Sequence, residues 1–186
     1  MRKFFVVLLT CSFFYLSLEA KEIAGVTLEE ERNIDGITLS LQGAGVRDKF
    51  FMDLYVASLY TSKPYDNTAS LLKADEPMCI TLTIISSLIS SEKMENASRE
   101  GFANTVQNNT PKMNEKIETF IAVFKEPIGN NDIYDLVYIP KYGVKIYKNK
   151  TLHVSIAGLD FKEALFGIWL GDKPAQESLK QALLGK

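Results

Sequence analysis

Histidine and cysteine are scarce in this sequence. The chain of 186 residues has one histidine, His153, and two cysteines, Cys11 and Cys79. A single histidine cannot form a histidine-based metal centre, and the chain carries no Cys/His metal spacing, no HExxH motif and no GxSxG motif. The sequence therefore predicts no metal site and no cofactor. We expect His153 to be a surface or cross-strand residue and Cys79 to be a small buried one.

Excess charge is also lacking. The formal net charge is −2, and acidic and basic residues are mixed along the chain without a basic block. Nucleic acid is not an expected partner, because binding its phosphates requires clustered Lys and Arg. The sequence has no glycine-rich phosphate loop, no internal repeat and no low-complexity tract. Its length and composition fit one globular domain with a hydrophobic core.

Long apolar runs are absent except at the N-terminus. Arg2 and Lys3 precede an apolar stretch over residues 4–18, and Ala20 is a small residue suited to cleavage. This stretch is shorter than the roughly 20 residues that span a bilayer. We predict that residues 1–20 are a signal peptide, that the protein is periplasmic or secreted, and that no membrane span remains after cleavage. An uncleaved anchor is the alternative. Cleavage would remove Cys11, and the remaining cysteine could form no intramolecular disulfide.

The stretch 37–61 contains the clearest strand pattern. Every second residue is apolar from position 50 to position 56, which predicts a half-buried strand. The expected apolar face consists of Phe50, Met52, Leu54 and Val56. A turn at Asp48-Lys49 would separate this strand from the one before it.

Two glycines and an arginine precede that strand. Gly43 and Gly45 lie inside a strand pattern, which marks a bulge or a close approach by another part of the chain. Arg47 follows them and could bind an anion together with Tyr55. A hairpin with a solvated arginine is the other interpretation of these residues.

The rest of the chain alternates predicted helices and strands. The helix at 91–107 is polar and is expected to face solvent, whereas the next helix, capped by Thr110, is amphipathic. A helix opening at Asp160 would bury Trp169 in the core. Short connections predict antiparallel neighbours among the last strands. Further strands are expected at 37–42, 78–85, 132–139, 143–148 and 151–157, and further helices at 66–74 and 174–184.

Several stretches together resemble one protein family. They are residues 41–47 (LQGAGVR), 55–60 (YVASLY) and 164–174 (ALFGIWLGDKP). These motifs resemble the chalcone isomerase-like superfamily, and most closely its bacterial exported branch, over about residues 22–185. The resemblance implies an α+β fold, an open-faced β-sandwich in which a large antiparallel sheet is covered by helices.

The resemblance also implies a site. The family includes enzymes that cyclise chalcones, fatty-acid binders, and members without a known reaction. Arg47 matches the arginine that steadies an oxyanion in the enzymes and meets a carboxylate in the fatty-acid binders. Tyr55 stands where the enzymes carry a threonine, and residues 90–104 lack their tyrosine; Asn96 and Asn104 have no clear counterpart. Most of the pocket of the plant enzymes is therefore absent, and chalcone cyclisation is not expected.

We accordingly predict a protein that binds a small lipophilic anion, such as a fatty acid, near Arg47. The predicted ligand-binding residues are Arg47, Tyr55 and Tyr60. Two alternatives stay open: an isomerase or intramolecular lyase acting on an unknown substrate, and a non-catalytic structural or partner-binding protein of the cell envelope. Whether the protein is an enzyme is not decided by its sequence.

Overall fold

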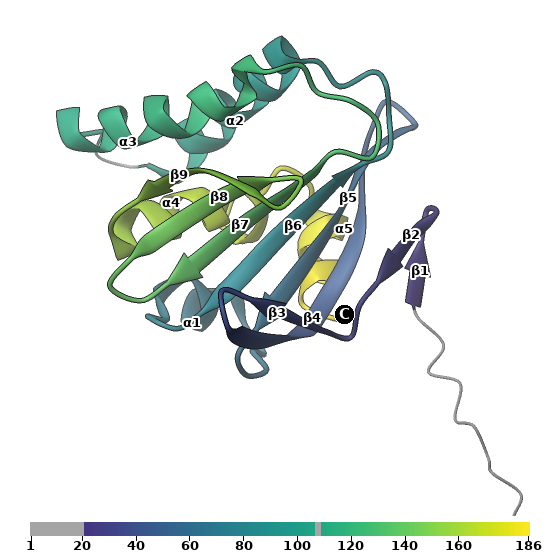
Figure 1. Ribbon diagram of the computed structural model, residues 1–186, viewed down its shortest axis with the longest axis horizontal. Helices are drawn as coiled ribbons and strands as arrows, with labels where there is room; N and C mark the ends of the chain where they lie inside the picture. The colour runs from purple at the N-terminus through teal and green to yellow at the C-terminus, as the bar shows by residue number, and fades with distance from the viewer. Residues whose placement is uncertain (1–20, 107–108) are drawn as a thin grey trace, which may run out of the picture.

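The structure, a computed structural model, describes residues 21–106 and 109–186. The predicted signal peptide lies outside these residues. The described chain forms a seven-stranded antiparallel sheet whose strand order follows the chain, and helices pack against it (Figure 1). The strands of the sheet are β3 (Glu31–Ile34), β4 (Ile37–Lys49), β5 (Met52–Thr61), β6 (Met78–Ile84), β7 (Ile133–Ile139), β8 (Gly143–Lys148) and β9 (Thr151–Ile156). A separate two-stranded hairpin consists of β1 (Lys21–Ile23) and β2 (Val26–Leu28).

The helices share one hydrophobic core with one face of the sheet. They are α1 (Thr68–Lys73), α2 (Ser91–Thr105), α3 (Pro111–Ile121) with the 3-10 turn η1 (Ala122–Lys125), α4 (Leu159–Leu170) and α5 (Glu177–Leu183). Ile80 and Leu136 from the sheet pack in the same cluster as Phe102 of α2 and Leu165 of α4. The predicted α+β architecture, a large antiparallel sheet covered by helices, is confirmed.

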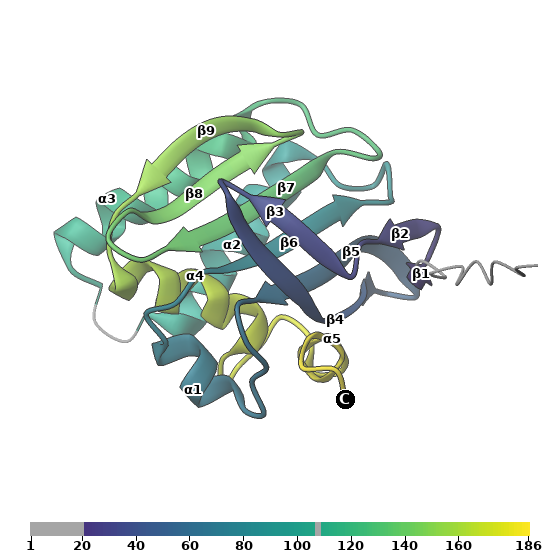
Figure 2. The same cartoon turned by 60° about the horizontal axis from the view of Figure 1, so that its bottom comes forward.

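The other face of the sheet is covered only in part. Figure 2 shows β3 and the first half of β4 passing in front of β6 and β7, because the sheet curls. Arg32 of β3 can therefore donate to Asp135 of β7 at 2.7 Å and to Thr81 of β6 at 2.6 Å. Burial alone would lower the pKa of Arg32, but the hydrogen bond and the charge of Asp135 raise it. This ion pair links β3, the first strand of the sheet, to β7 across the partly covered face.

A buried lysine joins α1 to α4. Lys162 of α4 has no exposed surface, and its Nζ donates to the carbonyls of Leu71, Leu72 and Ala74 at 2.7, 2.8 and 3.0 Å. These carbonyls lie at the C-terminal end of α1, where a cation is favoured by the helix dipole. Burial lowers the pKa of Lys162 to about 8. At pH 7 the amine is thus still charged and supplies all three donors.

The hairpin between β4 and β5 differs from the prediction. Its turn falls at Phe50-Phe51 and not at Asp48-Lys49, since both phenylalanines have positive φ, 52° and 62°. The predicted apolar face was wrong: Phe50 and Met52 are 77% and 43% exposed, and Leu54 packs against the main core while Val56 lies in a separate cluster with Ala44. This end of the hairpin extends beyond the covering helices, so alternation there does not produce burial.

Helix α2 was expected to face solvent, and this is correct for one side only, where Glu92 and Arg99 are exposed. Met94, Ser98 and Phe102 are buried at a helical spacing. Small side chains let α4 come close: a Cβ at Gly101 would lie 2.8 Å from Ile168 Cγ2. A buried stripe made partly of serine and glycine has little hydrophobic periodicity, so its burial could not be predicted from the sequence.

Smaller predictions were mixed. Thr110 caps α3 by accepting from the Met113 amide at 3.1 Å, as predicted. Helix α4 instead begins after Gly158, and Asp160 pairs with Lys116 at 2.7 Å. His153 is exposed and Cys79 is buried, as expected. No helix within residues 21–106 and 109–186 is long and apolar enough to cross a membrane.

Candidate ligand-binding site

The two glycines of β4 allow α5 to pack directly on the strand. A Cβ at Gly43 would lie 2.2 Å from the carbonyl oxygen of Ala182, and one at Gly45 would lie 2.7 Å from the Ala182 Cβ. A β-bulge also falls between Leu41 and Gly43. The predicted bulge and the predicted close approach are both confirmed. This close packing places the start of α5 beside Arg47.

Gln176, the residue before α5, fixes the end of β4. Its Oε1 accepts from Arg47 Nη1 at 3.0 Å and from the Asp48 amide at 3.1 Å. Its Nε2 donates to Asp48 Oδ1 at 2.5 Å. Arg47 also donates to the Asp48 carbonyl. The guanidinium is half-buried and oriented by these contacts, while its other N–H groups remain available as donors.

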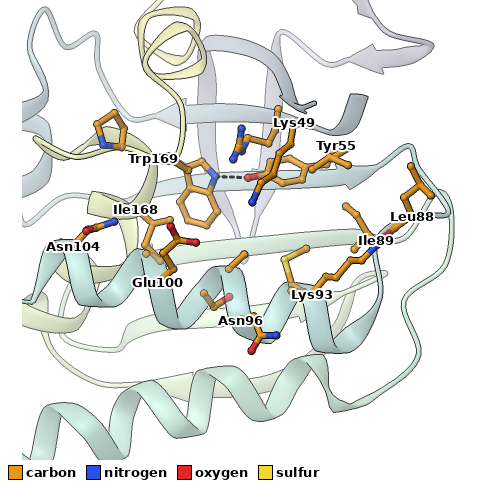
Figure 3. A pocket seen from close by; sticks show the side chains of 18 of the residues that line it. Lys49, Tyr55, Leu88, Ile89, Lys93, Asn96, Glu100, Asn104, Ile168 and Trp169 are labelled. Atoms are coloured by element: carbon orange, nitrogen blue, oxygen red, sulfur yellow. Dashed lines mark hydrogen bonds between the residues drawn. The ribbon is translucent and has the colours of Figure 1, made fainter. Parts of the chain in front are cut away.

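Arg47 and Tyr55 are directly opposite each other across the β4–β5 ladder. Tyr55 is 8% exposed, and its hydroxyl accepts from Trp169 Nε1 at 2.9 Å (Figure 3). Burial raises the pKa of Tyr55, while the Trp169 hydrogen bond and the nearby Arg47 charge act in the opposite direction. Tyr55 therefore stays a neutral phenol whose own O–H can donate.

A cavity of about 660 Å³ lies between this pair and α2. That volume falls within the range of roughly 300–1,000 Å³ that is typical of small-molecule sites. In Figure 3, Tyr55 and Trp169 lie across the cavity from Asn96 and Glu100 of α2. The apolar lining residues are Phe50, Met52, Leu54, Leu88, Ile89, Met94, Ala97, Ile168, Trp169, Pro174 and Ala175.

Positive charge predominates around the cavity. The charged lining residues are Arg47, Lys49, Lys93, Lys173 and Glu100. Exposed Lys49, Phe50 and Leu88 lie at one end, so the cavity opens to solvent there. Asn104, Lys173 and Ala175 of the lining are exposed as well, whereas Met94, Ile168 and Trp169 are buried. An apolar cavity with cations at its mouth suits a ligand with an anionic head and an apolar tail.

Tyr60, the third predicted ligand-binding residue, does not line the cavity. It lies in a separate cluster with Leu39, Cys79 and Val137 on the other face of the sheet, and Arg32 lies 5.3 Å from its ring centroid. An odd number of positions separates it from Tyr55, so strand alternation turns the two side chains to opposite faces. The structure thus brings Arg47 and Tyr55 together and leaves Tyr60 apart.

Some lining residues were not expected from the sequence. Trp169 was predicted to be a core residue, yet it also touches the cavity and orients Tyr55. Asn96 and Asn104, which could not be matched to family positions, both line the cavity. Gln176, which orients Arg47, was not expected either, because no feature of the sequence distinguishes it. Within the described chain, no group of three or more His, Cys, Asp or Glu residues could hold a metal ion.

Comparison with known proteins identifies the family. The family model described as chalcone isomerase-like matches residues 20–185, and the chain belongs to this family. Among solved structures, a fatty-acid binding protein of Arabidopsis thaliana is similar with a TM-score of 0.66 and 18% sequence identity, covering 83% of this chain and 96% of that one. No curated protein sequence matches the chain. The fold is therefore the chalcone isomerase-like fold.

Proposed function

We propose that the protein binds a lipophilic anion, such as a fatty acid, with its tail in the cavity and its head group at Arg47. The observation that carries the proposal is the Arg47–Tyr55 pair at the wall of an apolar cavity. A guanidinium and a phenol O–H can both donate to one carboxylate. The buried apolar lining residues, such as Met94, Ile168 and Trp169, supply the contacts for a hydrocarbon tail.

The family supports lipid binding in general terms. The Arabidopsis thaliana structure of the same fold is a fatty-acid binding protein. The site itself adds that the ligand should be anionic, because four of the five charged lining residues are cations. A neutral lipid would leave the Arg47 donors without an acceptor.

Oleate binding to the delipidated protein tests the proposal. We expect saturable binding in isothermal titration calorimetry with one site per chain, and a retained or added fatty acid in native mass spectrometry. Oleyl alcohol is the matched neutral probe and should bind more weakly. A protein that binds neither, after delipidation and with the fold intact, would refute the proposal.

We also propose that the protein is exported and acts in the periplasm or outside the cell. Arg2, Lys3, the apolar stretch and Ala20 support this. N-terminal sequencing of protein from the producing cell should begin at Lys21 or within a few residues. A protein that retains Met1 would rule out the cleaved signal peptide.

An isomerase or intramolecular lyase is the second candidate. The observation that favours it is a second polar group beside Arg47: the Tyr55 hydroxyl accepts from Trp169 and leaves its own hydrogen free to stabilise an oxyanion. Asn96 and Asn104 add amide groups on the far wall. Conversion of a bound phenolic enone, followed by absorbance and abolished in both Arg47→Ala and Tyr55→Phe, would establish it. Unchanged substrate after prolonged incubation would exclude that substrate class.

A further inference from the structure

The turn between β4 and β5 exposes large apolar side chains beside the mouth of the cavity. Phe51 is 105% exposed and Phe50 is 77% exposed. Met52 and Leu88, which line the cavity together with Phe50, are 43% and 44% exposed. Clustered apolar residues of this kind on a surface mark a site of interaction with a protein or a membrane.

The backbone of this turn is poorly suited to its residues. Phe50 and Phe51 both have positive φ, 52° and 62°. Two-residue hairpin turns of this geometry favour Asn-Gly, because bulky side chains clash with the backbone in the left-handed region. Asn-Gly would make the hairpin more stable and the surface less apolar. The two phenylalanines therefore lower the stability of the hairpin, which points to a role outside folding.

One lysine lies beside the exposed aromatic rings, and two more line the cavity. Lys49 Nζ lies 5.7 Å from the centroid of the Phe50 ring, and Lys93 and Lys173 lie along the same cavity. Asp48 and Asp53 flank the turn as well; with Glu100 they make three acidic residues against the four cations Arg47, Lys49, Lys93 and Lys173, so the region keeps a net positive charge. Aromatic side chains next to lysines match the two layers of an anionic membrane surface, where rings enter the acyl boundary and ammonium groups meet lipid phosphates.

We propose that the β4–β5 turn is a membrane-docking loop that inserts Phe50 and Phe51 into the surface of an anionic bilayer. Docking by this loop turns the mouth of the cavity toward the lipids. The purpose of docking rests on the proposed function: a lipophilic anion could then pass between the bilayer and the cavity without crossing bulk water. The docking itself does not depend on which ligand the cavity holds.

Vesicle co-sedimentation tests the proposal. Wild type and variants are expressed from the full coding sequence, so any effect of residues 1–20 is common to all of them. The probes are vesicles of equal parts phosphatidylglycerol and phosphatidylcholine, and vesicles of phosphatidylcholine alone. We expect binding to the anionic vesicles, weakened by added salt, and a loss of about tenfold or more in partitioning for Phe51→Gly. Phe51→Trp should keep the binding.

The controls separate docking from folding and from ligand binding. Glycine suits the positive φ of Phe51, so Phe51→Gly should unfold at an equal or higher temperature than wild type. Phe51 does not line the cavity, and oleate affinity without vesicles should not change. Tyr142 is 67% exposed in the β7–β8 turn at the other end of the sheet, and Tyr142→Ala should dock like wild type.

Three results would overturn the docking loop. They are a wild type that stays in the supernatant with anionic vesicles, a Phe51→Gly variant that sediments like wild type, and self-association that depends on Phe51 without vesicle binding. The last would mean that the loop contacts a second copy of the chain. Docking without any oleate binding would support the docking loop and refute only the proposed function. Oleate binding without docking would support the proposed function and refute the docking loop.

Discussion

Arg47 and Tyr55 are cross-strand partners on β4 and β5, with a shift in register immediately after Arg47. Residues directly opposite in an antiparallel pair have Cβ atoms about 4.5–5.5 Å apart, and their side chains share a face of the sheet. The turn at Phe50-Phe51 pairs Asp48 with Asp53, and the register shift that follows places Tyr55, instead of Leu54, opposite Arg47. The guanidinium and the phenol can therefore act on one ligand group.

Removal of the Arg47 guanidinium should weaken fatty-acid binding without unfolding the protein. A hydrogen bond to a charged group contributes about 1.5–3 kcal/mol, so Arg47→Ala should lower oleate affinity roughly ten- to 150-fold in calorimetry. Arg47→Lys should recover only part of the loss, because lysine lacks the forked donors. Arg99→Ala, which removes the same charge from the far side of α2, is the matched control and should bind like wild type. Equal affinities for Arg47→Ala and wild type would contradict the site.

The fluorescence of Trp169 should report ligand binding. It is the one tryptophan of the chain and it lines the cavity. An acyl chain that displaces water beside the indole should move its emission to shorter wavelength during an oleate titration. Tyr55→Phe keeps the ring but removes the hydroxyl, whose hydrogen bond to the charged carboxylate contributes about 1.5–3 kcal/mol, so we expect a roughly ten- to 150-fold loss of affinity. Emission that stays constant while calorimetry shows saturation would place the ligand elsewhere.

The close contact between β4 and α5 should not tolerate a side chain at Gly43. A Cβ there would lie 2.2 Å from the Ala182 carbonyl, so Gly43→Ala must displace α5. Overpacking of this kind typically lowers the free energy of unfolding by about 1–3 kcal/mol, which urea denaturation can measure. Gly129→Ala is the matched control, because its Cβ would meet Asp132 Oδ2 only at 3.8 Å. Equal stability of the two variants would mean that α5 moves without strain.

Lys162 should make the stability depend on pH in the alkaline range. Its pKa is about 8 in the folded protein and near 10.5 in the unfolded chain. Between these values the unfolded state holds the extra proton, so stability rises with pH, by about 1 kcal/mol per pH unit. Lys162→Met lacks this group.

The measurement is the difference in unfolding free energy between wild type and Lys162→Met, from urea denaturation at several pH values. Other shifted groups, such as Cys79 and Tyr65, contribute equally to both proteins and cancel. We expect the difference to move in favour of wild type from pH 8 to pH 10. A constant difference would show that Lys162 titrates alike in both states.

The sequence predicts the fold well where periodicity and turns agree. The last three strands and the Thr110 cap follow from alternation and capping chemistry. The short strands before Ile37 were missed because they are only three or four residues long and mix polar with apolar residues. Burial was mispredicted at Phe50 and Met52, since a strand pattern cannot reveal that the covering helices stop before the hairpin ends.

The site was predictable only in part. The family motif pointed to Arg47, and Tyr55 followed from its place on the next strand. Trp169 looked like any aromatic residue on a buried helix stripe, and nothing local distinguishes Gln176 from other surface amides. Their roles arise from the packing of α4 and α5 against β4 and β5, which only tertiary structure reveals.

The Arg32–Asp135 pair bears on the kinetics of folding. Neighbouring strands of the sheet are consecutive in the chain, and the longest connection between them, from β6 to β7, contains α2 and α3. This ion pair spans further still, because it joins residues 103 positions apart. It can close only once the intervening strands are in register, and contacts made late act on the unfolding rate. In stopped-flow experiments we expect Arg32→Met to unfold faster than wild type and to refold at nearly the same rate. A refolding rate that falls instead would place the ion pair in the transition state.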